Sequence, residues 1–282
     1  MSAERAPRTY LFVPGNRPER FGKALASGAD AIILDLEDAV VPAEKDAARN
    51  LAAQWLSAHA AQAQAASSRS AQVLVRVNDA ASVWFDEDLR MLREAGVRMA
   101  MLPKAEVPEQ AARVAQALGV PRSVLALVET ARGVRDVDAL AADPAVVRLA
   151  FGTLDYAVDL DLSGDDIGLL HAANRLAIAS RAAGIASPVA GVTPNIADDS
   201  ALLIELARAR ACGFGAKMCI HPRQVAAVHA ALAPSAVELD WARRVIDAAS
   251  RGTGAVQLDG KMVDRPVVLR AQAILARAGA GQ

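Results

Sequence analysis

Three charged side chains stand in or just after apolar runs, in a pattern that could hold a metal ion. Glu129 ends the run VLALVE, Asp155 follows Gly152 in AFGTLD, and Arg76 interrupts the run VLVRVN. Two carboxylates that share one pocket repel each other unless a cation lies between them, and Mg²⁺ takes oxygen ligands of this kind together with water and substrate. The spacing therefore allows a Mg²⁺ site at Glu129 and Asp155. The alternative from spacing alone is that Glu129 pairs with Arg132 and that Asp155 caps a turn.

Arg76 carries a permanent charge inside an otherwise apolar strand, so it needs an anionic partner. A carboxylate of the substrate can supply that partner, and so can Asp35 or Glu37 of the segment AIILDLEDAV. The sequence leaves both possibilities open: Arg76 either binds substrate or forms a structural ion pair inside the fold.

The segment AIILDLEDAV places Asp35, Glu37 and Asp38 at the end of a run that resembles a strand buried on both faces. Unpaired carboxylates in such a place are unfavourable unless cations or hydrogen-bond donors meet them. Lys104, which follows the run MAMLP, can bind an anion, or it can neutralise Glu106 and these acids. We favour the neutralising role for Lys104.

Eight short apolar runs rich in Val, Ile and Leu recur along the chain, and segments with helical spacing lie between them. Strand–helix alternation repeated eight times predicts an α/β fold of the (β/α)8 TIM-barrel type. In such barrels the carboxyl ends of the strands form the active-site face, and the acids described above follow strand ends. The runs lie at 9–14, 31–37, 73–78, 99–104, 124–130, 146–152, 187–193 and 215–221.

We predict that residues 1–232 form the barrel and that residues 233–282 form a C-terminal extension. The extension contains a helix at 238–250, then a turn-containing arm and a final helix. A segment of this length is too short to fold alone, so it must pack on the barrel or on another subunit. At the other end of the chain, Gly15 and Arg17 in VPGNRPER precede a helix and could bind a phosphate or a thioester arm, although one glycine is a weak signal.

Composition excludes several classes of function. The chain has 31 basic and 32 acidic residues and no basic stripe interleaved with aromatic residues, so we expect no nucleic-acid partner. No run reaches about 18 apolar residues and the first residues lack the apolar stretch of a signal peptide, so we expect no membrane partner and a cytoplasmic location. Nucleophilic and dinucleotide chemistries lose support because no Ser-His-Asp order and no CxxC, HExxH or GxGxxG motif is present.

Nine motifs, in order, resemble those of the citrate lyase beta subunit-like group of the HpcH/HpaI aldolase superfamily. They are LFVPGNRPERFGKAL, GADAIILDLEDAVVPAEKDAAR, VRVN, LPKAE, LALVETARGV, LAFGTLD, IAD, GFGAKMCIHPRQV and DGKMVDRPVVLRAQ. The resemblance implies a (β/α)8 barrel that forms homotrimers, with Mg²⁺ held by Glu129 and Asp155. It also implies that Arg76 holds the carboxylate of a 2-oxo acid. Glu37, Asp38 and Lys104 would then surround the metal ligands and Arg76 and keep them oriented.

The resemblance further implies Mg²⁺-dependent cleavage of a 3-hydroxy-3-carboxy-acyl thioester, of the citramalyl-CoA or malyl-CoA type, to an acyl thioester and a 2-oxo acid. Asp264 in DGKMVDRPVV matches an aspartate on a C-terminal lid, which suggests a general base acting on a neighbouring subunit. Many relatives carry acids where this chain has Ala190 and Asn195. We expect their loss at the barrel mouth to change the substrate or reduce the activity.

Three other functions stay open at this stage. The chain could be the beta subunit of a citrate lyase, acting on citryl groups carried by an acyl carrier protein. It could instead be a class II aldolase for free oxo acids. The third possibility is a weakly active binding or scaffold protein, which the residues Ala190 and Asn195 favour.

Overall fold

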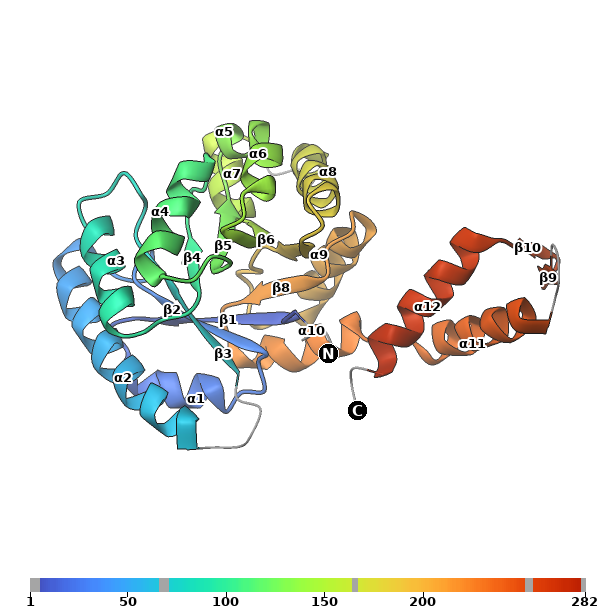
Figure 1. Cartoon of the computed structure of the whole chain (residues 1–282), viewed down its shortest axis with the longest axis horizontal. Helices are drawn as coiled ribbons and strands as arrows, with labels where there is room; N and C mark the ends of the chain where they lie inside the picture. The colour runs from blue at the N-terminus through green and yellow to red at the C-terminus, as the bar shows by residue number, and fades with distance from the viewer. Residues whose placement is uncertain (1–5, 66–70, 164–166, 252–255, 280–282) are drawn as a thin grey trace. The chain divides into compact units, whose positions relative to one another are not determined.

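The computed structural model describes residues 6–65, 71–163, 167–251 and 256–279. These residues form two compact units, one from Ala6 to Val228 and the other beginning at His229. The first unit is a closed barrel of eight parallel strands in chain order, β1 to β8, ringed by helices (Figure 1). The predicted (β/α)8 fold with C-terminal helices is therefore confirmed.

The strands of the barrel coincide with the eight apolar runs. They are β1 (Thr9–Pro14), β2 (Ala31–Asp35), β3 (Gln72–Arg76), β4 (Ala100–Leu102), β5 (Val124–Val128), β6 (Val146–Phe151), β7 (Ala186–Ala190) and β8 (Ala216–Cys219). The helical segments between and after them are η1 (Pro18–Arg20), α1 (Phe21–Leu25), η2 (Pro42–Glu44), α2 (Lys45–Ala65), α3 (Phe85–Glu94), α4 (Pro108–Leu118), α5 (Ala131–Arg135), α6 (Val137–Ala142), α7 (Thr153–Asp159), α8 (Ile167–Ala182), α9 (Asp199–Ala211) and α10 (Pro222–Leu232).

The interior of the barrel is filled by alternate residues of the strands, because successive side chains of a strand point to opposite faces. This interior cluster includes Ile33 of β2, Leu74 of β3 and Leu127 of β5. Asp35, Arg76 and Glu129 each follow one of these three residues by two positions in the sequence. The alternation that buries the aliphatic core therefore also carries these three charged side chains to the inner side of the carboxyl end.

The amino-terminal end of the barrel is closed by Arg148 of β6, which is 3% exposed. Its guanidinium donates to the carbonyl oxygens of Ser187 at 2.6 Å and Pro7 at 2.5 Å, and also to the hydroxyl of Tyr10 at 3.3 Å. The guanidinium also lies 5.7 Å from the centre of the Tyr10 ring. An arginine thus fills one end of the barrel, which leaves the carboxyl end for chemistry.

The second unit contains α11 (Ala236–Arg251), the two-stranded antiparallel sheet of β9 (Val256–Leu258) and β10 (Lys261–Val263), and α12 (Arg265–Gly279). Ala242 and Val245 of α11 pack with Ala271 and Ile274 of α12 in a separate small core. The extra helix, the turn and the final helix predicted for the C-terminal extension are all present. Among the described residues, no helix is both long and apolar enough to span a membrane.

We expect Arg148→Met to destabilise the barrel by about 1–3 kcal/mol, because the carbonyl oxygens of Pro7 and Ser187 and the hydroxyl of Tyr10 lose their donor. Urea denaturation followed by circular dichroism measures this change. Arg90→Met is the matched control, since Arg90 is exposed and pairs with Glu87 one turn earlier on α3, and it should shift the free energy of unfolding by less than about 0.5 kcal/mol. Equal effects of the two variants would contradict the closing role of Arg148.

Candidate active site

Arg76 is the centre of an ion-pair cluster at the carboxyl end of the barrel. Its Nε and Nη2 atoms donate to the two carboxylate oxygens of Asp35, both at 2.7 Å, and its guanidinium lies 4.9 Å from the centre of the Phe12 ring. Burial disfavours the charged guanidinium, but the charge and hydrogen bonds of Asp35, together with the charges of Glu37 and Asp38, outweigh it and raise the pKa of Arg76. The ion pair anticipated as one of two possible roles of Arg76 is therefore present.

Glu37 lies between the two cations of the cluster and is 5% exposed. Its Oε2 is 2.9 Å from Arg76 Nη1, an ion pair without hydrogen-bond geometry, and its Oε1 accepts a hydrogen bond from Lys104 Nζ at 3.1 Å. Asp38 is exposed and lies 3.2 Å from the same Nη1. Burial raises the pKa of Glu37 to about 7 in spite of the attraction of Arg76 and Lys104. The neutralising role predicted for Lys104 is borne out at Glu37.

Glu129 follows β5 and is 2% exposed. Its Oε1 accepts a hydrogen bond from the backbone N–H of Lys104 at 2.8 Å, and within the described chain its Oε2 accepts none. Burial, followed by the negative charges of Glu37 and Asp155, raises the pKa of Glu129 to about 8. The alternative partner Arg132 lies 3.4 Å from Glu106 instead. Glu129 is thus a buried carboxyl group without an adequate counter-charge.

Asp155 lies in the first turn of α7 and is exposed, near enough to Glu129 to influence its pKa. Gly152, between β6 and α7, makes room for the glutamate: a Cβ there would lie 2.3 Å from Glu129 Oε2 and 2.6 Å from Glu129 Cβ. The described residues contain no group of three His, Cys, Asp or Glu side chains arranged for a metal. The two carboxylates nevertheless suit an ion such as Mg²⁺, which takes few protein ligands and keeps several waters.

Two buried basic residues of α2 lie within the motif GADAIILDLEDAVVPAEKDAAR but were not selected as site residues; Lys45 supports the acidic loop and Arg49 ties α2 to α3. Lys45 Nζ donates to the carbonyl oxygens of Leu36 and Glu37, both at 2.7 Å. Arg49 Nε donates at 2.7 Å to Asp88, whose other oxygen accepts from the backbone and side chain of Asn78. The only available signal was the basic pair at the start of a helix that follows the acids, and such pairs are common on exposed helices.

Gly15 and Arg17, the candidates for a phosphate or thioester arm, stand in the loop after β1. Gly15 donates its N–H to Asp35 O at 2.8 Å, and a Cβ at Gly15 would lie 2.8 Å from both that oxygen and a methyl carbon of Leu36. Close packing against Asp35 and Leu36 is therefore sufficient to explain why a glycine stands at position 15. Arg17 is exposed and approaches Glu19 only to 4.0 Å. Binding of a thioester arm here stays a prediction.

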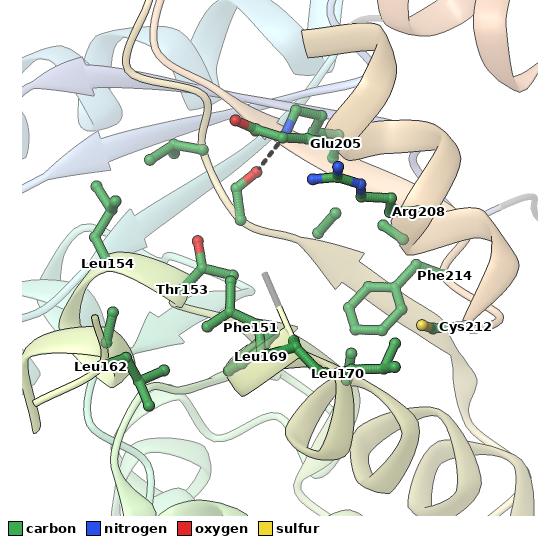
Figure 2. Close-up of a pocket in the computed structure, with 18 of the residues that line it drawn as sticks. Phe151, Thr153, Leu154, Leu162, Leu169, Leu170, Glu205, Arg208, Cys212 and Phe214 are labelled. Atoms are coloured by element: carbon green, nitrogen blue, oxygen red, sulfur yellow. Dashed lines mark hydrogen bonds and ion pairs between the residues drawn. The ribbon is translucent and has the colours of Figure 1, made fainter. Parts of the chain in front are cut away.

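Ala190 does not lie where the sequence analysis placed it. Val189 belongs to the interior cluster of the barrel, so the next side chain, Ala190, points away from the mouth. Ala190 lines a separate, mostly apolar cavity of about 580 Å³ between the barrel wall and helices α7, α8 and α9 (Figure 2). Asn195 is exposed, and its Oδ1 accepts a hydrogen bond from the N–H of Ala197 at 3.0 Å. The structure thus places Ala190 on the outer face of β7, and the effect of Ala190 and Asn195 on substrate or activity stays a prediction.

Asp264 belongs to the second unit, between β10 and α12. It is exposed, and its Oδ1 accepts a hydrogen bond from the backbone N–H of Val267 at 3.1 Å, at the start of α12. The lid role of Asp264 stays a prediction.

Comparison with known proteins now adds to this geometry. Residues 8–222 match the family described as HpcH/HpaI aldolase/citrate lyase, and residues 172–280 match one described as a C–C bond lyase of the TIM-barrel fold. The citrate lyase subunit beta of Leuconostoc mesenteroides subsp. cremoris is 34% identical over 99% of this chain and 96% of its own length. The (3S)-malyl-CoA thioesterase of Cereibacter sphaeroides is 32% identical over 97% of this chain and 95% of its own.

Among solved structures, CitE from Mycobacterium tuberculosis in complex with magnesium, acetoacetate and coenzyme A superposes with a TM-score of 0.83 and 36% identity. The superposition covers 97% of this chain and 98% of the other. A family match over most of the barrel, together with relatives above 30% identity along nearly the whole chain, leads to one conclusion. The chain belongs to the HpcH/HpaI aldolase/citrate lyase family of carbon–carbon lyases.

Proposed function

We propose that this protein is a Mg²⁺-dependent lyase that cleaves a 3-hydroxy-3-carboxy-acyl thioester of the citramalyl-CoA or malyl-CoA type. The products are an acyl thioester and a 2-oxo acid. The observation that carries the proposal is Glu129, a buried carboxyl at the barrel mouth that lacks a counter-charge and has Asp155 near it. A CitE relative bound to magnesium, acetoacetate and coenzyme A and a relative named for malyl-CoA support this choice of ion and substrate.

Glu129 and Asp155 would hold the Mg²⁺ ion, with waters and substrate oxygens completing its shell. When bound, Mg²⁺ supplies Lewis-acid stabilisation for negative charge on the substrate oxygens and a template for their orientation. The chain's own part is to keep Glu129 in place through the Lys104 N–H and to keep the acidic loop closed through Lys45.

Arg76 would bind the carboxylate that becomes part of the 2-oxo acid. Asp35 holds two of its N–H groups in a bidentate pair, which fixes the plane of the guanidinium. The Nη2 atom carries a second N–H that no described residue accepts. In this proposal Glu37 and Asp38 orient Arg76, and the substrate carboxylate takes the remaining donor.

The reaction requires a base that removes the proton of the substrate hydroxyl. The electrons of the O–H bond then form the carbonyl of the 2-oxo acid, and those of the breaking carbon–carbon bond move into the thioester as an enolate, which a proton later quenches. We propose Asp264 as this base, contributed by the C-terminal unit of a neighbouring subunit in a homotrimer. Gly15 and Arg17 would contact the thioester arm.

A screen of acyl-CoA substrates with the purified protein and Mg²⁺ tests the proposal. Citramalyl-CoA or malyl-CoA should yield an acyl-CoA, detected by chromatography, and an equal amount of a 2-oxo acid, detected with phenylhydrazine. Turnover of free hydroxy acids without any thioester would replace the proposal with a class II aldolase.

The similarity to a citrate lyase subunit beta favours one alternative, cleavage of citryl groups on an acyl carrier protein. Citryl-loaded carrier protein and citryl-CoA, offered at equal concentrations, separate the two functions. Turnover of the carrier-bound citryl group alone would establish the alternative.

We expect Glu129→Gln and Asp155→Asn each to remove Mg²⁺ binding and turnover while leaving the barrel folded, because each removes a charged oxygen with little change in volume. Titration calorimetry with MgCl₂ measures the binding, and circular dichroism checks the fold. Asp159→Asn, on the same helix α7, is the matched control and should bind Mg²⁺ normally. Wild-type Mg²⁺ affinity in both site variants would refute the assignment of the ligands.

Mg²⁺ binding should also depend on pH. Because the pKa of Glu129 is raised from 4.5 to about 8, a proton must leave when the ion binds below that pH. The apparent affinity should rise by up to about tenfold per pH unit between roughly pH 5 and 8. The metal-free fold holds this proton more tightly than the unfolded chain does, so its stability should fall as pH rises through the same window. Calorimetry at pH 7 in buffers of different ionisation enthalpy detects the released proton; its absence would contradict the raised pKa.

We expect Asp264→Asn to fold and to bind Mg²⁺ normally but to turn over about 10²–10⁴ times more slowly, as loss of a general base does. Asp259→Asn, in the β9–β10 turn, is the matched control and should keep the wild-type rate. If Asp264 acts on a neighbouring subunit, mixing Asp264→Asn with Arg76→Ala under subunit exchange should restore part of the activity. A wild-type rate for Asp264→Asn would place the base elsewhere, and a slow variant that mixing never rescues would show action within one chain.

A further inference from the structure

Lys104 has a backbone conformation that a lysine rarely adopts. Its φ is +45°, in the left-handed region, and the other non-glycine residues with positive φ in the described chain are Asp161 and Asp259. Aspartate visits this region more readily, because its short side chain can hydrogen-bond locally, whereas lysine has no such compensation. Lys104 stands directly at the candidate metal site, where an unfavourable backbone conformation is a reason to look for a role.

The unusual conformation turns one backbone donor away from the sheet. Pro103 has no N–H, and the N–H of Ala105 donates to Leu127 O at 2.9 Å, between neighbouring strand ends. Between these two residues, the N–H of Lys104 donates to Glu129 Oε1 at 2.8 Å. The backbone N–H of Lys104 therefore does not take part in the hydrogen bonding between the strands and binds the proposed metal ligand Glu129 instead.

The side chain of Lys104 acts at the same time in another direction. Its Nζ donates to Glu37 Oε1 at 3.1 Å, and Glu37 is buried against Arg76. A glycine would adopt the left-handed backbone at little cost but would lose this ammonium group. The lysine therefore joins the two raised-pKa glutamates of the mouth through one residue.

Glu129 is confined from the opposite side by Gly152. A Cβ at residue 152 would lie 2.3 Å from Glu129 Oε2, so the missing side chain leaves only enough room for the carboxylate. With Oε1 held by Lys104 and the rest of the group packed against Gly152, the carboxylate has one orientation. A metal ligand that is already oriented loses less conformational entropy when the ion binds.

We propose that Lys104 is a positioning residue, whose left-handed backbone aims its N–H at Glu129 and whose ammonium group anchors that backbone to Glu37. The inference rests on the proposed Mg²⁺ site and adds to it the main-chain conformation that prepares the ligand. Lys104 therefore has two effects on the site: the positive charge of its side chain and the left-handed conformation of its backbone. A single substitution would change both effects together.

Lys104→Gly and Lys104→Ala separate these effects, because both lack the ammonium group and only alanine resists the left-handed backbone. Without the anchor, alanine should relax toward an ordinary backbone and release Glu129. We expect Lys104→Gly to bind Mg²⁺ about five- to thirtyfold more tightly than Lys104→Ala, the ratio that a left-handed penalty of this size implies.

Asp259 provides a matched control, since it has a φ of +51° in the β9–β10 turn, within the second unit. Asp259→Gly and Asp259→Ala should differ in melting temperature but should bind Mg²⁺ with equal affinity. If Lys104→Ala does not fold, Lys104→Asn and Lys104→Gln replace the pair, because asparagine tolerates the left-handed region and glutamine does not.

Titration calorimetry with MgCl₂ decides the outcome. Tighter binding by Lys104→Gly than by Lys104→Ala, with no difference between the Asp259 variants, supports the inference. Equal affinities in the Lys104 pair, on a background of wild-type protein that binds Mg²⁺, overturn the inference and leave the proposed function standing. A wild-type protein that binds no Mg²⁺ overturns both.

Discussion

The shortage of positive charge at the carboxyl end of the barrel is the constraint on which the rest of the site depends. Five carboxyl groups, those of Asp35, Glu37, Asp38, Glu129 and Asp155, are gathered around three cations, Arg76, Lys104 and Lys45. Burial raises the pKa values of Glu37 and Glu129 to about 7 and about 8, and because Asp35 takes most of the guanidinium, the remaining positive charge does not offset that burial. A divalent cation is the simplest addition that would let both glutamates ionise.

Maintaining such a cluster requires support from outside the strands. Lys45 fastens the acidic loop by two backbone carbonyls, and Lys104 holds an unfavourable backbone conformation to bring its N–H to Glu129. Both features cost stability that a purely apolar loop would not, since a buried ammonium must be desolvated and a left-handed lysine is strained. Their location at one end of the barrel, opposite the end that Arg148 closes, is typical of sites where stability is given up for function.

The sequence predicted the fold well because the barrel depends on local patterns. Each strand is an apolar run, and the polar residues that end these runs mark the mouth. Prediction from sequence failed in two respects: which face of a strand a side chain lies on, and which of several charged residues form an ion pair. Ala190 was assigned to the mouth, but strand alternation turns it outward, and a shift of one residue is enough to change the face. Likewise, charge and spacing could not tell that Arg132 pairs with Glu106 rather than Glu129, or that Lys104 acts through its backbone.

The same cluster limits which groups of the barrel can accept a proton from substrate. Glu129 and Asp155 are unavailable while they hold a cation, and Glu37 lies between Arg76 and Lys104. The Nδ1 atom of His221, after β8, accepts a hydrogen bond from the backbone N–H of Arg223 at 3.2 Å and is engaged in that turn. Among the described residues, the mouth is therefore equipped to bind and stabilise anions but holds no evident base of its own. An acid brought from another segment, as proposed for Asp264, answers that deficiency without disturbing the charges that hold the metal ligands in place.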